Sequence, residues 1–356
     1  FCALGVLLVF VIDAFFFREL KNKQYFIYGF FIAICLAYID VFKRQATNLQ
    51  KLAIPTFFEK IIPKITLPLV FLLIIYGYVS EIVGFSWYVV SFAVMLIAIG
   101  FYLFKYFKPV YTLNYKDLFQ EIPKKQYYQY SLYAFSASLG SFFAFRIDSI
   151  MIPQFLSNTA NGDFNIGVNL ANALMIPAAG VFALYSPLIS EALKKNDLSV
   201  LKIKYANVAK NLFFIGIILY GCVLLGMKDF FEILPTADKL LPVLPVLYIL
   251  GGNVVLNMAT GFNTEIIAYS KFYRFNLIAI VILAILNVGL NYYVLTQTTY
   301  GIIGVAWASF FAMLVFNSTK LWVIYRKFNM LPINANYIKT IVSSFILLAI
   351  AFALPL

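Results

Sequence analysis

One repeating pattern limits what this chain can fold into: stretches of about 20 mostly apolar residues recur, separated by short charged or Pro- and Gly-containing segments. A helix of that length spans the roughly 30 Å hydrocarbon core of a bilayer. Strands of a membrane barrel would alternate apolar and polar residues, and these stretches do not. Hydrophobic residues make up 63% of the chain and charged residues 12%, which excludes an ordinary soluble domain. The sequence therefore predicts an all-α, multi-pass integral membrane protein with about 10–11 transmembrane helices.

The predicted spans have approximate boundaries, because hydropathy does not define helix ends. They are 1–17, 25–42, 56–79, 83–104, 127–154, 163–190, 203–226, 241–263, 275–295, 301–325 and 337–356. The chain begins Phe1-Cys2-Ala3 and ends within an apolar run at Leu356, so we expect it to be a fragment with its first helices missing.

The charges between spans predict a topology and a division into two lobes. The longest connection, Lys105–Gln126, carries more Lys than acidic residues, which places it in the cytoplasm. By alternation, the loop Leu156–Gly162, which contains no Lys or Arg, faces outside, whereas the loop near Lys195 faces inside. We expect an N-terminal lobe at 1–104, a cytoplasmic linker at 105–126, a six-helix C-terminal lobe at 127–325, and the start of a further helix at 326–356.

The net charge of +12 does not indicate nucleic acid, because the Lys and Arg residues form short clusters between spans rather than one basic face. The chain has no histidine, which excludes His-based zinc sites and Ser-His triads. Cys2, Cys35 and Cys222 lie in apolar spans without metal-ligand spacing. We therefore expect no metal and no cofactor.

Charged residues inside the spans are the first candidates for a functional site, because they are costly in a bilayer and usually face a cavity. Arg146 and Asp148 lie within the span 127–154, two positions apart, so their side chains point to nearly opposite sides of the helix. The alternative is an ion pair that neutralises itself, or snorkelling to lipid head groups. Asp40, within the span 25–42, is a second acidic candidate. Lys60 and Lys64 form a cationic face that binds either lipid phosphates or substrate.

Amide side chains form stripes at helical spacing in the second half of the chain. Their residues are Asn165, Asn169 and Asn172, then Asn253 and Asn257 followed by Thr260 and Thr264, then Asn287 and Asn291. Such amides either join helices by hydrogen bonds or line a hydrophilic cavity. Three stripes in one half favour a shared cavity.

Several short motifs resemble those of one transporter family. They are Arg146-Ile147-Asp148-Ser149-Ile150-Met151-Ile152, Gly162-Asp163-Phe164-Asn165, Pro177, Ser186-Pro187-Leu188-Ile189-Ser190 and Tyr300-Gly301-Ile302-Ile303-Gly304-Val305-Ala306-Trp307-Ala308-Ser309. The chain resembles polysaccharide flippases, the O-antigen and exopolysaccharide exporters of the superfamily that also contains the multidrug and toxin extrusion (MATE) carriers.

This resemblance implies two six-helix lobes of a MATE-like fold around a central cavity, with Lys105–Gln126 as the linker between the sixth and seventh helices. It implies alternating-access export of an undecaprenyl-pyrophosphate-linked oligosaccharide across the bacterial inner membrane, in contact with membrane lipids. The substrate-binding candidates are then Arg146, Lys60, Lys64, Asn165, Asn169, Asn172, Asn253 and Asn257. The candidates for a coupling cation, H+ or Na+, are Asp148 and Asp40.

Three other functions remain open on the sequence. A MATE-type multidrug/cation antiporter would use an acidic, aromatic cavity, to which Asp148 and Asp40 are suited. A membrane-embedded polymerase or glycosyltransferase usually carries a large external loop, and no predicted external loop here is long. A scaffold without transport activity would have no use for intramembrane charges. We therefore expect a transporter and not an enzyme.

Overall fold

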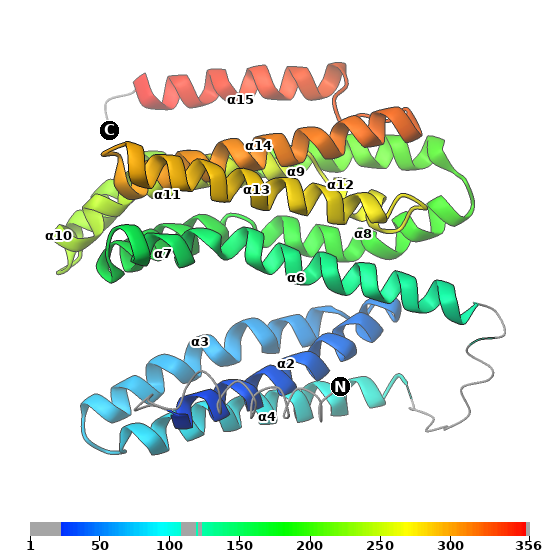
Figure 1. The fold of residues 1–356 in the computed structure, drawn as a ribbon. Helices are drawn as coiled ribbons and strands as arrows, with labels where there is room; N and C mark the ends of the chain where they lie inside the picture. The colour runs from blue at the N-terminus through cyan, green and yellow to red at the C-terminus, as the bar shows by residue number, and fades with distance from the viewer. Residues whose placement is uncertain (1–22, 108–118, 120–122, 354–356) are drawn as a thin grey trace. The chain divides into compact units, whose positions relative to one another are not determined.

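The computed structural model describes residues 23–107, 119 and 123–353, and every regular element among them is helical (Figure 1). The predicted span 1–17 and most of the predicted linker lie outside the described residues. The chain divides into two compact units, Phe1–Asn114 and Tyr115–Leu356. The division falls within the segment predicted to be the linker.

The first unit contains three described helices, α2 (Lys23–Asn48), α3 (Ala53–Ile75) and α4 (Glu81–Phe104). α4 packs against both α2 and α3. The core is formed by apolar side chains of α2 and α4, among them Ile39, Met95 and Ile99, each at most 1% exposed. Gly84 permits the close contact of α4 with α3, because a Cβ there would lie 2.7 Å from Ile74 Cδ1.

The second unit is a bundle of long helices with short connecting pieces. Its helices are α6 (Lys124–Phe155), α7 (Asn158–Ala173), α8 (Ile176–Lys194), α9 (Leu198–Ile233), α10 (Ala237–Leu240), η1 (Leu241–Val243), α11 (Leu244–Ala259), α12 (Asn263–Ala268), α13 (Arg274–Gln297), α14 (Gly301–Phe328) and α15 (Ala335–Ala353). α13 packs against α6 and α14, and α11 packs against α7, α9 and α14. The helices α6, α7, α11, α13 and α14 therefore surround one interior.

Eight helical segments of the described chain are long and apolar enough to cross a membrane. Seven belong to the second unit, and α4 belongs to the first. α2 and α3, of 26 and 23 residues, are long enough but contain charge clusters, Asp40, Lys43 and Arg44 in α2 and Glu59, Lys60 and Lys64 in α3. The all-α, multi-pass prediction is confirmed.

The predicted span 163–190 is wrong as a single helix. The structure has two helices there, α7 and α8, joined at Leu174 and Met175. Pro177 lies in the first turn of α8, and because a proline has no N–H to donate to the preceding turn, it favours a break or bend at this position. The expected external loop Leu156–Gly162 is also shorter than predicted, because α7 already begins at Asn158 and Ser157 caps it by accepting a hydrogen bond from Ala160 N.

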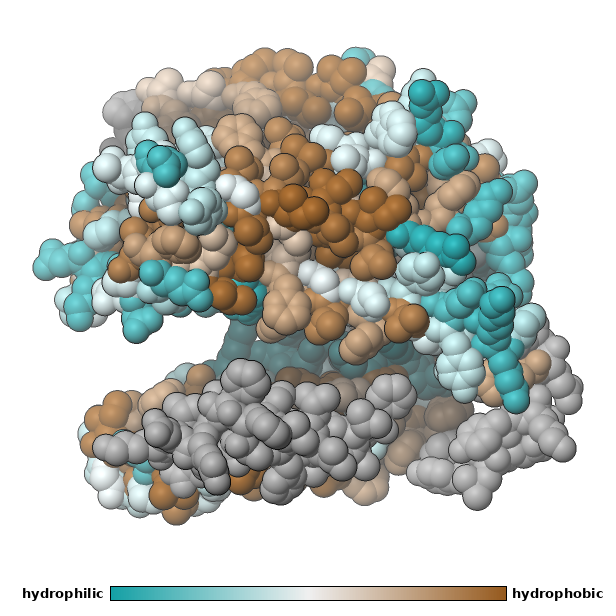
Figure 2. Space-filling model, viewed as in Figure 1, coloured by the Kyte–Doolittle hydropathy of each residue, from teal (hydrophilic) through white to brown (hydrophobic). Residues whose placement is uncertain are grey.

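The surface of the second unit has the distribution of a membrane protein. In the view of Figure 2, apolar residues form a band across the middle of its long helices, and hydrophilic residues gather toward the helix ends. Large apolar side chains of α13 and α14 are exposed, including Ile285, Trp307, Phe311 and Trp322. In water this exposure would be costly, whereas in a bilayer lipid chains cover such side chains.

The predicted topology can be tested at two exposed positions of the second unit. Cysteines introduced at Ser157 and Lys195, in a background where Cys2, Cys35 and Cys222 are replaced, should react with an impermeant thiol reagent from opposite sides of the membrane. Ser157 should be labelled in intact cells and Lys195 only after permeabilisation. Labelling of both positions in intact cells would contradict the topology.

Candidate functional site

Two neighbouring cavities lie among the helices of the second unit. The first, here called the Arg146 pocket, has a volume of about 350 Å³ and is lined by residues of α6, α7, α11, α13 and α14. The second, here called the Lys320 pocket, has a volume of about 320 Å³ and lies toward the α12 end of the same helices. The pockets share Phe145, Asn257 and Met313. Both volumes are within the range of small-ligand pockets, about 300–1,000 Å³.

The two charged residues predicted within one span both line the Arg146 pocket, but their surroundings differ. Arg146 is exposed, and no ion pair involving it occurs in the described part of the chain. Asp148 is 7% exposed and also makes no ion pair there. The two do not neutralise each other, which leaves the guanidinium available to a ligand.

Asp148 is held by hydrogen bonds from two distant helices. Asn291 Nδ2 of α13 donates to Asp148 Oδ1 at 2.5 Å, and Ser309 Oγ of α14 donates to Asp148 Oδ2 at 2.9 Å. Asn287, one turn before Asn291, donates from its Nδ2 to the carbonyl of Ala144 at 3.1 Å. These bonds fix the carboxylate where α6, α13 and α14 meet.

Two buried oxygens of this cluster have no hydrogen-bond partner among the residues that the structure describes. They are Oδ1 of Asn287 and Oδ1 of Asn291, whose residues are 4% and 0% exposed. A buried polar atom without a partner costs free energy and calls for an explanation. Carboxylate, amide and hydroxyl oxygens together are the donors preferred by hard cations. The cluster of Asp148, Asn287, Asn291 and Ser309 thus has the chemistry of a site for a small cation.

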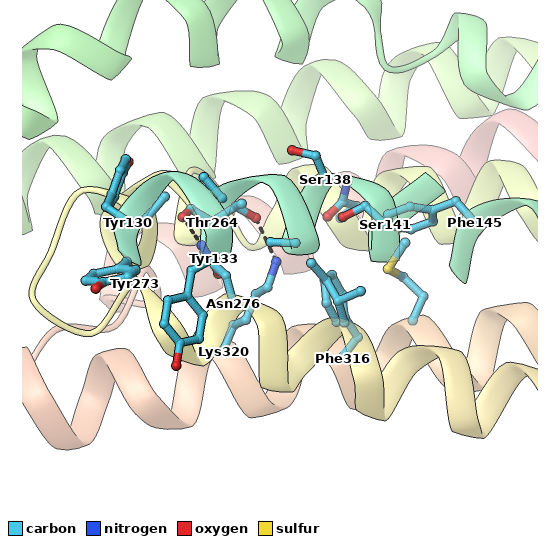
Figure 3. Close-up of a pocket in the computed structure, with 16 residues that line it drawn as sticks. Tyr130, Tyr133, Ser138, Ser141, Phe145, Thr264, Tyr273, Asn276, Phe316 and Lys320 are labelled. Atoms are coloured by element: carbon cyan, nitrogen blue, oxygen red, sulfur yellow. Dashed lines mark hydrogen bonds between the residues drawn. The ribbon is translucent and has the colours of Figure 1, made fainter. Parts of the chain in front are cut away.

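The Lys320 pocket holds a buried cation that the sequence did not single out. Lys320 is 3% exposed, its Nζ donates to Thr264 Oγ1 at 2.8 Å, and it lies 3.8 Å from the ring centroid of Phe316. In Figure 3 the side chains of Lys320, Thr264 and Asn276 converge on one region of the pocket. Asn276 Nδ2 donates to the carbonyl of Thr264 at 3.4 Å, so α12, α13 and α14 meet there.

A tyrosine cluster lies at one end of the Lys320 pocket (Figure 3). Tyr273 packs against Tyr130 and Tyr133, with ring centroids 5.1 and 5.9 Å apart. The Arg274 guanidinium lies 5.1 Å from the Tyr133 ring. By the predicted topology this end is cytoplasmic, whereas the Arg146 pocket lies farther along α6 toward the outside.

A second acid, Glu265, acts electrostatically on Lys320 without forming an ion pair in the described part of the chain. Glu265 belongs to the short helix α12, outside the apolar spans. Burial raises the pKa of Glu265 above its ordinary value, and the positive charge of Lys320 partly opposes that rise.

The three asparagines of one predicted stripe, Asn165, Asn169 and Asn172, have different surroundings. Asn165 accepts a hydrogen bond from Ser149 Oγ of α6 at 3.0 Å and donates to Asn161, so it joins helices. Asn172 lines the Arg146 pocket, and Asn169 is exposed. Both Asn253 and Asn257 line the Arg146 pocket, and Asn257 also borders the Lys320 pocket.

The candidates of the first unit lie on α2 and α3. Lys60 and Lys64 are exposed. Asp40 is exposed too, at 70% of its side chain, and lies 3.7 Å from Lys43, which makes a closer ion pair of 2.8 Å with Glu59. The structure therefore brings Arg146, Asp148, Asn172, Asn253 and Asn257 together in one unit, whereas Lys60, Lys64 and Asp40 belong to the other.

The prediction from sequence did not include Lys320, Ser309 or Glu265. Lys320 lies within the predicted apolar span 301–325 and follows Phe316 by one turn. A lysine inside such a span is a signal that could have marked it as a candidate site residue. Ser309 ends one of the motifs that resemble those of the flippases, but the sequence predicts no role for its side chain. No local pattern links it to Asp148, because 161 residues separate the two.

No protein-family model matches the chain, and no curated protein matches it in sequence. Its fold, however, is similar to that of solved MATE structures. A crystal structure of MATE in complex with MaL6 has a TM-score of 0.71 and 15% identity, over 92% of this chain and 76% of that chain. A proline-to-alanine mutant of MATE gives a TM-score of 0.69 and 15% identity, over 91% and 74%. An outward-facing multidrug resistance MATE family transporter of the MOP superfamily gives 0.67 and 14%, over 92% and 77%. At this level of identity the similarity establishes the fold, and the chain has the fold of the MATE transporters.

Proposed function

We propose that this protein is a flippase that moves an undecaprenyl-pyrophosphate-linked oligosaccharide across the bacterial inner membrane by alternating access. The observation that carries the proposal is the exposed guanidinium of Arg146, which lines a cavity within the membrane-spanning unit and makes no ion pair in the described part of the chain. A guanidinium stays charged when desolvated and can hold a phosphate through two parallel hydrogen bonds.

The wall of the Arg146 pocket supports a polar substrate. Asn172, Asn253 and Asn257 supply amide donors and acceptors from α7 and α11. Sugar hydroxyls both donate and accept, so amides suit them without adding charge. Lys60 and Lys64 of the first unit remain candidates for contact with the same anionic substrate or with lipid phosphates.

Asp148 and its partners support coupling of transport to a cation. A cation bound by the carboxylate and the free amide oxygens would join α6, α13 and α14. Binding energy of that kind can shift a carrier between two conformations only if the site differs between them. Na+ fits this oxygen-rich cluster, and H+ would bind at the carboxylate alone. Asp40, paired with Lys43, is the weaker coupling candidate.

A MATE-type multidrug/cation antiporter is the second candidate, favoured by the same Asp148 and by the aromatic walls of the Lys320 pocket. Two cationic side chains, Arg146 and Lys320, line the cavities and would repel cationic drugs. An anionic substrate is therefore the better fit to the charges of the two pockets.

The deciding experiment places the complete protein in liposomes with two alternative substrates. Undecaprenyl-pyrophosphate-linked oligosaccharide on one leaflet should become accessible to an impermeant glycosidase on the other side, whereas efflux of ethidium should stay at the level of empty liposomes. Ethidium efflux without glycan movement would support the antiporter instead. Movement of neither substrate would contradict both functions.

A further inference from the structure

Lys320 is a buried lysine on which the acid Glu265 acts electrostatically. It is 3% exposed, and no ion pair involving it occurs among the described residues. An ammonium group has three N–H donors, and Thr264 Oγ1 is the acceptor recorded for them. Buried N–H donors without acceptors are costly, so a lysine beside a cavity in this state is suited to a ligand group that accepts hydrogen bonds and carries negative charge.

The walls of the Lys320 pocket combine aromatic rings with small polar groups. Tyr130, Tyr133 and Phe316 supply the rings, and Ser138 and Ser141 supply hydroxyls on α6 (Figure 3). A sugar ring has apolar C–H faces and a rim of hydroxyls. Aromatic faces pack well against apolar ring surfaces, while a few polar groups fix the orientation of a ligand.

The charges around the pocket favour a singly charged ligand group over a multiply charged one. Glu265 acts electrostatically on Lys320, and it repels a ligand with one negative charge less than a ligand with several. The ammonium of Lys320 is a point charge, in contrast to the planar fork of Arg146 that matches phosphate geometry. A carboxylate fits Lys320 better than a pyrophosphate does.

We propose that the Lys320 pocket binds an acidic sugar of the transported glycan, with the sugar carboxylate on Lys320 and its ring against the tyrosine cluster. This inference rests on the proposed flippase function. The two pockets share Phe145, Asn257 and Met313, so the sites for the pyrophosphate and for the acidic sugar adjoin each other. With this site, the protein selects glycans in which an acidic sugar lies close to the lipid.

Binding to the complete, detergent-solubilised protein tests this site without transport. The probes are a disaccharide of glucuronate and glucose, the neutral disaccharide of two glucoses, and inorganic phosphate, each titrated by calorimetry. The acidic disaccharide should bind at least about tenfold more tightly than the neutral one, since a charge-assisted hydrogen bond separates them. Lys320→Met should remove this preference.

Lys327→Met is the matched control, because Lys327 is an exposed lysine of the same helix outside both pockets and should leave the preference intact. Tyr133→Leu, which keeps the ammonium, should weaken both disaccharides by similar factors, and it tests the ring platform if Lys320→Met cannot be purified. Equal binding of both disaccharides to the unmodified protein would overturn the proposal. So would a preference that survives Lys320→Met, or tighter Lys320-dependent binding of phosphate than of the acidic disaccharide.

These outcomes are independent of the transport result. A protein that shows the Lys320-dependent preference but moves no lipid-linked glycan would refute the proposed function and retain the acidic-sugar site. A protein that moves the glycan lipid but binds acidic and neutral disaccharides equally would refute the site alone.

Discussion

Replacing Arg146 by alanine is expected to reduce translocation of the lipid-linked oligosaccharide by roughly ten- to a hundredfold, the range that loss of hydrogen bonds to a charged group implies. The guanidinium lines its pocket without an ion-pair partner in the described part of the chain, so its removal strands no buried acid. Protein level and monodispersity should stay normal. The glycosidase-protection assay in liposomes measures the change.

One further variant separates charge from geometry at this position, and a second serves as its control at another arginine. Arg146→Lys should recover part of the activity, because lysine restores the charge but not the paired hydrogen bonds. Arg326→Ala, at an exposed arginine of the last turn of α14, should transport normally. Normal transport by Arg146→Ala would place the pyrophosphate elsewhere, as would a loss explained by degradation of the protein.

Asp148→Asn is expected to abolish the dependence of transport on an imposed cation gradient. The substitution keeps the shape of the side chain but replaces a charged oxygen by an amide that cannot bind a cation as strongly. Uphill accumulation driven by a Na+ or pH gradient should fall to the level without a gradient, while exchange of substrate at equal concentrations continues. Comparing the two gradients in the unmodified protein identifies the coupling ion.

Asp148→Leu should behave differently, since it leaves Asn291 and Ser309 with buried donors and no acceptor. We expect the free energy of unfolding to fall by about 1–3 kcal/mol for each unsatisfied group. Asp238→Asn, at an exposed acid of α10, is the control for both variants. If Asp148→Asn retains full gradient-driven accumulation, the carboxylate is a structural group that positions α13 and α14.

The helices and the charged residues of α6 could be predicted because their signals are local. Apolar runs define α4, α9, α13 and α14 from composition and length alone. Arg146 and Asp148 stand out because charge is rare inside such runs. The break between α7 and α8 was signalled by Pro177, but an apolar run on both sides concealed that two helices meet there.

The partners within the site could not be predicted because they come from helices distant in sequence. Asn291 follows Asp148 by 143 positions in the chain, and a single sequence contains no record of their contact. The burial of Lys320 could not be predicted for another reason. Lys320 precedes Arg326 and Lys327, whose charges indicate a cytoplasmic helix end, and only the packing of the helices shows that its side chain is buried. The Asn165 stripe separated into different roles because hydrogen-bond partners, rather than helical spacing, decide where an amide is used.

The partition between the two cavities has a consequence for how tightly different ligands bind. Phe145, Asn257 and Met313 border both spaces, so one elongated molecule that occupies both would have its two ends bound close together. Once one end is bound, the other end is confined near its own site at a high effective concentration, and two weak contacts combine into a strong one. Free sugars and free phosphate gain nothing from this tethering. A cell interior rich in both would therefore leave the carrier unoccupied until a molecule that joins them arrives.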